Sequence, residues 1–471
     1  MTSAGTSSNG ALSFPAHFTW GAATAAYQIE GAANVDGRGL SIWDTFSRQP
    51  GKINRGDTGD VACDAYHRYR EDVALMSTLG LNSYRFSISW PRVQPGGTGA
   101  INQQGLEYYK ALLDELANHN IAAAVTLYHW DLPQELQDVG GWAVRSTAER
   151  FSEFAQIIAE NLGDRVASWI TLNEPQVVAS HGYRDGNHAP GLQDDEAAAA
   201  ATHHLLVAHG LAAQALRSVT PNTPVGITLD LHPVLLTGDH SDVLEQARVA
   251  TDAEQNGIFL DPVLHGRYPA GARAVLLPSD SLIADRDFAT IQQPLDFLGI
   301  NYYAPVYLRA GDPDDLRQHE EPASCGLPGV VEYRPSELER TPMGWLVNSD
   351  GLYQLLVRLS EEAPGLPLYV TENGRASEDY VDPKGVVNDV DRINYLHQHL
   401  DASARAIKAG VNLAGYYVWS LLDNFEWGWG YQKRFGIVYV DFETQRRIPK
   451  ASAGFYGNVV RANAVPSLPA G

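Results

Sequence analysis

The stretch Trp169-Ile170-Thr171-Leu172-Asn173-Glu174-Pro175 carries the pattern that decides the fold. Apolar and β-branched residues run up to the acid, and the proline then ends the run. This pattern is typical of a buried strand that presents one carboxylate at its C-terminal end. A second stretch of the same design, Leu368-Tyr369-Val370-Thr371-Glu372-Asn373-Gly374, ends at a glycine. The two stretches therefore predict two buried strands, each with a glutamate at its end.

Six further candidate strands alternate with helical patterns along the rest of the chain. The eight predicted strands lie near residues 19–23, 84–90, 123–128, 169–173, 225–230, 297–303, 368–372 and 414–419. Helical stretches separate them, including one after Asp64 that Gly80 ends and an alanine-rich one over 196–219. Strands and helices in this order favour an α/β fold, a closed (βα)8 TIM barrel whose long βα loops form the active-site mouth. An open doubly wound sheet is the competing fold, but no glycine-rich phosphate turn follows the first strand.

The predicted domain organisation has two parts. Residues 1–12, rich in Ser, Thr and Gly, are expected to form a disordered N-terminal lead-in, and residues 13–465 a single catalytic barrel. The longest irregular stretch, 309–343, is rich in proline, glycine and charge and follows the sixth predicted strand. Because long loops in compact proteins are often functional, we expect this stretch to form part of the pocket mouth.

Composition limits the partners and the compartment. The net charge of −22 argues against nucleic acid and anionic membranes, and no run of eighteen apolar residues predicts a membrane span. The two cysteines, Cys63 and Cys325, make no disulfide framework, so a reduced cytoplasmic setting is expected. The sequence has no His-x-x-x-His or Cys-x-x-Cys pair, and no metal site is expected.

The motif Asn173-Glu174-Pro175, followed later by Thr371-Glu372-Asn373-Gly374, resembles glycoside hydrolase family 1, the β-glucosidase family. The resemblance covers nearly the whole chain through matching segments at 18–31, 41–46, 56–64, 128–133, 301–303 and 419–427. It implies a retaining β-glycosidase, in the first place a β-glucosidase. Such an enzyme hydrolyses terminal non-reducing β-D-glucosyl residues of cello-oligosaccharides and of aryl or alkyl β-glucosides by double displacement.

The resemblance also implies the catalytic roles. It makes Glu174 the acid/base and Glu372 the nucleophile, and it places Tyr303 against the nucleophile. Arg85 is expected on the same rim of the barrel, where a guanidinium beside Glu372 favours the ionised carboxylate. The negative charge of Glu372 would favour the protonated form of Glu174 until formation of the sugar ester removes that charge.

Further residues are implied to bind the sugar or the leaving group: Gln28, His129, Trp130, Asn173, Asn301, Trp345, Trp419, Glu426 and Trp427. Among these, Trp419 is implied as the stacking platform and Glu426 as the acceptor for the two hydroxyls farthest from the scissile bond. Because a carboxylate repels a phosphate dianion, Glu426 predicts a non-phosphorylated sugar. The leaving-group side matches the family less well, since Gln176 stands where many relatives have tryptophan. Whether Arg375 adds positive potential near Glu372 or faces solvent stays open.

Several alternatives remain open from the sequence. The expected partners are small-molecule β-glycosides and oligosaccharides, with homo-oligomer formation left open, and no cofactor is expected because two carboxylates suffice. Glucose, galactose and fucose differ at single groups, so β-galactosidase or β-fucosidase activity is an alternative. A transglycosidase would use the same intermediate, whereas an inactive sugar-binding barrel or a metal-dependent hydrolase would belong to other classes.

Overall fold

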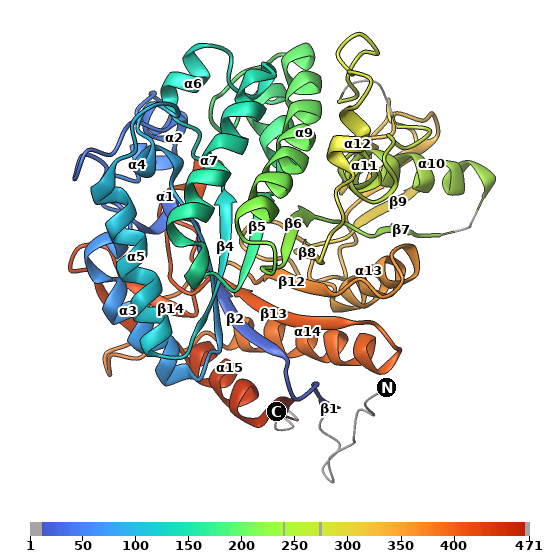
Figure 1. Ribbon diagram of the computed structural model, residues 1–471. Helices are drawn as coiled ribbons and strands as arrows, with labels where there is room; N and C mark the ends of the chain where they lie inside the picture. Colours follow the sequence, from blue (N-terminus) through green and yellow to red (C-terminus); the bar gives the residue numbers. More distant parts are fainter. Residues whose placement is uncertain (1–11, 239–240, 273–275, 467–471) are drawn as a thin grey trace.

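The computed structural model describes residues 12–238, 241–272 and 276–466, and its centre is a closed barrel of parallel strands (Figure 1). In chain order the barrel strands are β2 (Thr19–Ala23), β3 (Ser83–Ser87), β4 (Ala122–Tyr128), β5 (Ser168–Asn173), β6 (Val225–Asp230), β8 (Phe297–Asn301), β12 (Leu368–Asn373) and β13 (Leu413–Trp419). Pairing of β13 with β2 closes the barrel. The predicted (βα)8 barrel and its eight strands are confirmed.

The predicted strand bounds differ from the observed ones by more than one residue at two C-terminal ends. The strand predicted over 84–90 ends at Ser87, because Trp90 starts the short helix α4 (Trp90–Val93) with Pro91 in its first turn. The strand predicted over 297–303 ends at Asn301, and Tyr302 and Tyr303 already belong to the following loop. Both differences lie where strands pass into the loops at the C-terminal end of the barrel.

Long helices surround the barrel and bury their apolar faces against it (Figure 1). They are α3 (Ala65–Leu79), α5 (Gln103–Asn118), α7 (Ser146–Leu162), α9 (Asp195–Val219), α11 (Ile258–His265), α13 (Ser349–Glu362), α14 (Val390–Lys408) and α15 (Ala451–Ala462). Gly80 ends α3 with a left-handed φ of 83°, the conformation that glycine adopts at least cost. At the start of α9 the Asp194 side chain accepts a hydrogen bond from the Ala197 amide.

Further elements occupy the connections between the barrel strands and these helices. The helices in the connections are α1 (Ala26–Ile29), α2 (Ile42–Ser47), η1 (Asn54–Gly56), α6 (Gln134–Asp138), η2 (Gly141–Ala143), η3 (Gly163–Arg165), α8 (Pro175–Val177), η4 (Val178–Arg184), α10 (Asp242–Asp252), η5 (Ala253–Gly257), α12 (Asp287–Ile291) and η6 (Trp427–Trp429). Two strand pairs lie outside the barrel, β1 (Leu12–Ser13) with β16 (Ala464–Val465) and β14 (Val438–Asp441) with β15 (Arg446–Pro449).

The stretch 309–343 is not irregular throughout, and this part of the prediction is wrong. It contributes to a four-stranded sheet in the order β10 (Glu320–Pro322), β11 (Val330–Tyr333), β9 (Val306–Ala310) and β7 (Val234–Leu236). A small separate core beneath the sheet includes Val234, Leu308 and Val330. These strands are only three to five residues long, and β9 pairs with β7, which precedes it by a long stretch of chain, so the local pattern gave no clear signal for the sheet.

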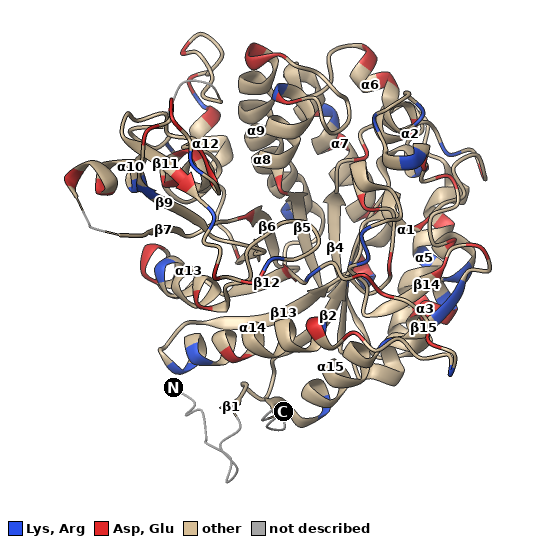
Figure 2. Ribbon diagram, turned by 180° about the vertical axis from the view of Figure 1, so that it is seen from behind, with Lys and Arg blue, Asp and Glu red and all other residues tan. Residues whose placement is uncertain are grey.

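The predicted disordered lead-in, residues 1–12, lies outside the described residues except for Leu12, which pairs with Val465. Acidic residues, the source of the net charge of −22, are spread over helices and loops on several sides of the molecule (Figure 2). The charge therefore does not single out one binding surface. Among the described helices, none is long and apolar enough to span a membrane.

Candidate active site

A pocket of about 380 Å³ lies at the C-terminal ends of the barrel strands. This volume lies within the range of about 300–1,000 Å³ that small-molecule sites occupy. Carboxylates, imidazoles and aromatic rings make up most of its wall, which consists of His129, Trp130, Glu174, Val177, His181, His188, Asp230, His232, Tyr303, Ala304, Met343, Trp345, Glu372, Trp419, Glu426, Trp427, Trp429 and Phe435. The pocket thus brings both strand-end glutamates into one cavity.

Local backbone irregularities turn the two glutamates into this pocket. Glu174 follows β5 with a left-handed backbone, φ 46° and ψ 60°, and its amide donates to the Thr228 carbonyl at 2.9 Å. A left-handed backbone is uncommon for a residue other than glycine and is often found at functional sites. The pairing of β12 with β8 shifts register between Val370 and Glu372, which interrupts the usual alternation of side chains.

Glu372 is buried and held at both carboxylate oxygens. Arg85 Nη1 donates to Oε1 at 2.7 Å, and the Tyr303 hydroxyl donates to Oε2 at 2.8 Å. Burial raises the pKa of Glu372 above its ordinary value, whereas the charge of Arg85 and the hydrogen bond from Tyr303 oppose the rise. The ionised form of Glu372 is therefore the form that its partners stabilise.

Glu174 has a different environment in the same pocket. Its Oε1 accepts a hydrogen bond of 2.6 Å from the amide of Asn301, a neutral group. Burial, followed by the negative charge of Glu372 and that of Asp230, raises the pKa of Glu174 well above its ordinary value. When the two carboxyls share one proton, the proton resides on Glu174 and the charge on Glu372.

A buried layer of hydrogen bonds beneath the pocket connects the two glutamates. Arg85 Nη2 donates to Asn173 Oδ1 at 2.5 Å, and Asn301 Nδ2 donates to the same oxygen at 3.1 Å. Thr371 Oγ1 donates to Asn301 Oδ1 at 2.8 Å. Arg85, Asn173 and Asn301 are buried and do not line the pocket wall. Arg85 and Asn301 contact the glutamates from below, and Asn173 connects the two.

Three buried polar atoms at one end of the site have no hydrogen-bond partner among the described residues: Gln28 Oε1, His129 Nδ1 and Glu426 Oε2. The amide of Gln28 donates to Asn424 Oδ1 and to the Phe425 carbonyl, which leaves its oxygen free. Because a buried polar atom without a partner costs roughly 1–3 kcal/mol, this end of the site is complementary to a ligand that brings several hydroxyl groups.

Burial also sets the charge of these groups. Burial, together with the nearby Arg85, lowers the pKa of His129 well below its ordinary value, so the imidazole is neutral. Burial and the charge of Glu372 raise the pKa of Glu426 to about 8.

Aromatic rings form the apolar part of the wall. The rings of Trp130 and Trp427 lie 4.5 Å apart, and Trp345 packs against Tyr303 at 5.0 Å. The ring of Trp419 lies 5.8 Å from that of His129. Trp130 is fixed by its indole N–H, which donates to the Asn173 carbonyl at 2.9 Å. Such rings offer flat faces to the C–H face of a pyranose.

Asp230 and His232 line the pocket but were missed in the sequence analysis. His232 Nε2 lies 2.9 Å from Asp230 Oδ2, and its Nδ1 lies 2.8 Å from the Ala304 carbonyl. Burial lowers the pKa of His232, but the charge of Asp230 and these hydrogen bonds outweigh it and raise the pKa to about 9. Asp230 stands at the end of a predicted strand, as Glu174 does. A carboxylate at such a strand end is the sequence signal that could have indicated Asp230 as a site residue.

Gln176 and Arg375, the two residues near the glutamates that depart from the family pattern, each form a polar contact within the structure. Gln176 does not line the pocket, and its amide donates to the Asp230 carbonyl behind the wall. Arg375 is buried and pairs with Glu339. The charge of Arg375 is therefore compensated rather than directed at the nucleophile.

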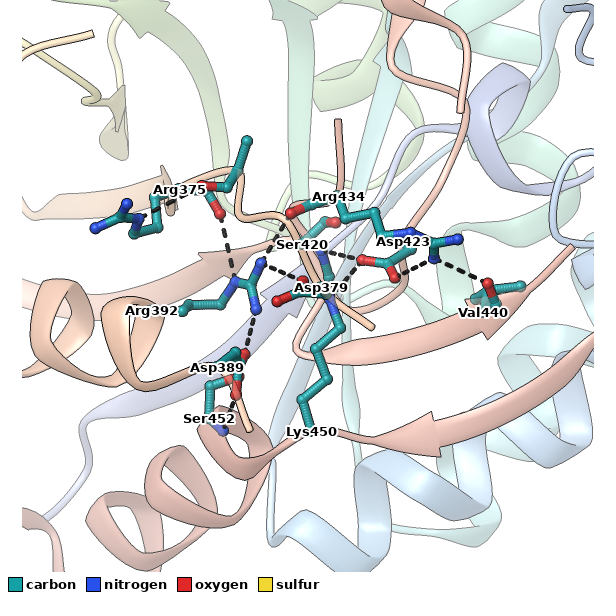
Figure 3. A network of polar contacts seen from close by, with 12 residues as sticks. Arg375, Asp379, Asp389, Arg392, Ser420, Asp423, Arg434, Val440, Lys450 and Ser452 are labelled. Atoms are coloured by element: carbon teal, nitrogen blue, oxygen red, sulfur yellow. Dashed lines mark hydrogen bonds and ion pairs between the residues drawn. The ribbon is translucent and has the colours of Figure 1, made fainter. Parts of the chain in front are cut away.

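A buried charge network joins the segment after β12 to the loop that carries Glu426 (Figure 3). Lys450 Nζ contacts Asp379 at 2.6 Å and Asp423 at 2.7 Å. Arg392 pairs with Asp379 at 2.7 Å, and Arg434 pairs with Asp423 at 2.6 Å. Asp423 lies three positions before Glu426, so the network anchors one wall of the pocket to the C-terminal part of the chain.

Replacing Lys450 with methionine is expected to lower the free energy of unfolding by about 3 kcal/mol, because the change leaves buried carboxylates without one of their cations. Urea unfolding monitored by circular dichroism measures the effect. Lys408→Met, at an exposed position in the last turn of α14, is the matched control and should change the value by less than about 0.5 kcal/mol. Equal effects of the two substitutions would contradict this role of the network.

Two buried carboxylates with unlike partners, placed in an aromatic pocket on the rim of a parallel barrel, define a glycoside hydrolase. The model of glycosyl hydrolase family 1 matches residues 11–465, and the chain belongs to this family. The resemblance found in the sequence is thereby confirmed. In the part of the chain that is described, no group of three or more His, Cys, Asp or Glu residues is placed to hold a metal ion.

Named relatives agree with this family. The chain is 50% identical over 457 residues to the thermostable β-glucosidase B of Thermobispora bispora, covering 96% of this chain and 92% of that protein. It is 45% identical over 453 residues to a bifunctional β-D-glucosidase/β-D-fucosidase of Bifidobacterium breve, covering 94% and 97%. The solved family 1 β-glucosidase of Thermotoga maritima superposes with a TM-score of 0.90 at 44% identity, covering 97% of this chain and 100% of that one.

Proposed function

We propose that the chain is a retaining β-glucosidase in which Glu372 is the nucleophile and Glu174 the general acid/base. The observation that carries the proposal is the unlike environment of two carboxylates in one pocket. Glu372 is paired with a guanidinium at 2.7 Å, whereas Glu174 accepts from a neutral amide at 2.6 Å. A retaining glycosidase needs this division, with one carboxyl ionised for attack and the other protonated for departure of the leaving group.

In the first step, a Glu372 oxygen attacks the anomeric carbon while Glu174 gives its proton to the glycosidic oxygen, and the leaving group departs as an alcohol. The product is a glycosyl ester of Glu372. In the second step, Glu174 takes a proton from water, the water oxygen attacks the anomeric carbon, and the ester bond breaks. Two inversions at one carbon leave the β-configuration unchanged.

The change of role of Glu174 follows from electrostatics. Formation of the ester removes the negative charge of Glu372, which is the second cause of the raised pKa of Glu174. The pKa of Glu174 then falls, and the carboxylate becomes available as a base. Arg85 remains in place throughout and stabilises Glu372 again when the ester breaks.

The proposed sugar site uses three of the buried polar atoms that lack a hydrogen-bond partner among the described residues, on Gln28, His129 and Glu426, together with the ring of Trp419. We expect hydrolysis of 4-nitrophenyl β-D-glucoside and cellobiose, with slower hydrolysis of the β-D-galactoside. The β-D-fucoside is a second candidate substrate because a relative is named for both activities. A 6-phosphoglucoside should be a poor substrate, because the buried carboxyl of Glu426 gives a phosphate dianion no cationic partner and repels it wherever Glu426 is ionised. A faster reaction with the 6-phosphoglucoside than with the glucoside would contradict the assignment of Glu426.

We also propose that residues 13–465 act as one catalytic domain and that the protein works in the reducing cytoplasm. The barrel strands and their surrounding helices fall within this range. Cys63 and Cys325 are free and buried, which fits a protein that needs no disulfide.

Replacing Arg85 with glutamine is expected to move the acid limb of the pH profile of kcat/KM to higher pH by about one pH unit or more. Activity needs ionised Glu372, and Arg85 is the cation that lowers the pKa of this carboxyl, so its removal lets the pKa rise. The profile is measured with an aryl β-D-glucoside. Arg165→Gln, at a surface site on η3, is the control and should leave the limb in place. A shift of the acid limb to lower pH in the Arg85 variant would contradict the pairing.

A further inference from the structure

A second cavity, the lower cavity, lies inside the barrel at the end opposite to the active-site pocket. Its volume is about 310 Å³. Its wall contains the first residues of five barrel strands: Thr19 of β2, Ser83 of β3, Ala122 of β4, Ser168 of β5 and Phe297 of β8. These residues mark the N-terminal end of the barrel. Among the described residues, none lines both cavities, so the mechanism above does not use the lower cavity.

The lower cavity is enclosed by the inner face of the barrel strands. Ala122 and Ala124 line it from β4, and Tyr369 and Thr371 line it from β12. Side chains two positions apart share one face of a strand, and in a barrel the inner face encloses the interior. Bulky branched residues usually fill the interior of a parallel barrel. The two alanines are small, and their strand leaves space that such residues would occupy.

The aromatic rings of the lower cavity are held in place by glycines on neighbouring strands. A Cβ atom added at Gly21 of β2 would lie 2.2 Å from a ring carbon of Tyr417. One added at Gly415 of β13 would lie 2.7 Å from a ring carbon of Tyr369. The ring of Phe297 lies 5.2 Å from that of Tyr369, edge to face. These rings are preorganised, so a ligand that packs on them need not order them first.

The polar groups of the lower cavity already have hydrogen-bond partners within the chain. The Ser83 hydroxyl donates to the Ala122 carbonyl at 3.0 Å and lies 2.8 Å from the Tyr417 hydroxyl. In the described part of the chain, no buried polar side-chain atom of this wall lacks a partner, and no charged side chain lines it. The active-site pocket differs in both respects. A neutral apolar ring therefore gains more in the lower cavity than a sugar rich in hydroxyls.

The lower cavity opens to solvent at its rim. Ala122, Ala167 and Pro224 in the wall are exposed, whereas Ala124 and Ile170 are buried. A ligand can therefore enter from the N-terminal end of the barrel, place an apolar part deep in the cavity and leave a polar group at the rim.

The buried layer of hydrogen bonds beneath the active-site pocket separates the two cavities. Thr371 lines the lower cavity, and its hydroxyl donates to Asn301 Oδ1 at 2.8 Å. The amide of Asn301 in turn donates to Glu174, which lines the active-site pocket. A molecule in the lower cavity and a sugar in the active-site pocket therefore do not compete for the same atoms and can be bound together.

We propose that the lower cavity is a second ligand site, which takes one small neutral aromatic molecule of the phenol class. The ring of the ligand lies among the rings of Phe297, Tyr369 and Tyr417, and its hydroxyl group lies at the exposed rim, where water hydrates it. The volume of about 310 Å³ is at the lower end of the range of small-molecule sites, which suits a single-ring ligand. The proposal does not depend on the β-glucosidase function.

The test is a titration of the unaltered protein with 4-fluorophenol, followed by ¹⁹F NMR, first without and then with saturating glucose in the active-site pocket. We expect saturable binding with a Kd of about 1 mM, in keeping with the small size of the ligand. Glucose should leave this Kd unchanged within about twofold.

Three variants locate the binding. Ala122→Trp places an indole in the opening and should weaken binding by about tenfold or more. Tyr369→Leu keeps an apolar side chain without the ring and should weaken binding by roughly tenfold, the size of one aromatic contact. Ala117→Trp, at an exposed position on α5, is the matched control for Ala122→Trp and should leave the Kd unchanged. Circular dichroism of each variant checks that it is folded, and Tyr369→Leu, which adds no bulk, decides alone if Ala122→Trp is not.

Three results would overturn the proposal. One is the absence of saturable binding to the unaltered protein. The second is an equal Kd in the unaltered protein, Ala122→Trp and Tyr369→Leu, because the probe would then bind elsewhere. The third is release of the probe when glucose is added, which would place the probe in the active-site pocket.

Discussion

Replacing Glu372 with glycine is expected to reduce kcat for an aryl β-D-glucoside by roughly 10⁶-fold, the loss seen when another covalent hydrolase loses its nucleophile. The substitution removes the carboxylate that forms the glycosyl ester in the proposed mechanism, while the proton donor Glu174 and its partner Asn301 remain. The fold should persist, because Glu372 lies at the end of a strand whose pairing is formed by the backbone.

Azide should restore activity to Glu372→Gly, which is the second part of this test. The cavity left in Glu372→Gly can admit a small anion, which attacks the anomeric carbon from the side that Glu372 occupied. With 2,4-dinitrophenyl β-D-glucoside, added azide should restore turnover and yield the α-glucosyl azide, identified by proton NMR. Glu378→Gly, at an exposed position in the same segment, is the matched control and should retain full activity without azide. Hydrolysis by Glu372→Gly without azide would contradict the assignment of the nucleophile.

Replacing Glu174 with alanine is expected to lower kcat/KM for cellobiose by about 10²–10⁴-fold, the usual contribution of a general acid. The same variant should form the glycosyl ester from 2,4-dinitrophenyl β-D-glucoside at nearly the normal rate, because this leaving group departs without a proton. Release of the sugar from Glu372 should then become slow, since water has lost its base. Stopped-flow measurement of the dinitrophenol burst separates the two steps.

Azide distinguishes the two glutamates. In Glu174→Ala, azide intercepts the ester on Glu372 and should give the β-glucosyl azide, the opposite anomer to that expected from Glu372→Gly. The alkaline limb of the pH profile should also disappear with Glu174, the group whose raised pKa sets that limb. An α-azide from this variant would mean that the two roles are exchanged.

The barrel could be predicted from the sequence because each of its strands carries a local signal. A parallel strand buried on both faces is a short apolar run, and its C-terminal end is marked by a polar residue or by proline or glycine. Glu174 and Glu372 stand at such ends within recognised motifs, whereas Asp230 stands at such an end without one. The strand end alone was therefore the only signal for Asp230.

The features that could not be predicted depend on distant partners. The strands β7 and β9 pair through residues 234–236 and 306–308. Nothing in the sequence of either segment indicates that it pairs with the other. Likewise, the sequence did not decide whether Arg375 adds charge to the site, because its partner Glu339 lies far away along the chain. The pKa of Glu372 was expected to follow the charge of Arg85, whereas burial, the first cause of its rise, depends on the completed pocket.

The anomer of glucose released first tests the central claim, a double displacement through Glu372 and Glu174, most directly. Proton NMR of the unaltered protein with an aryl β-D-glucoside follows the anomeric signals before mutarotation mixes them. We predict that β-glucose appears first and that α-glucose accumulates only as mutarotation proceeds. Initial release of α-glucose would show a single inversion and would contradict the proposed roles of the two glutamates.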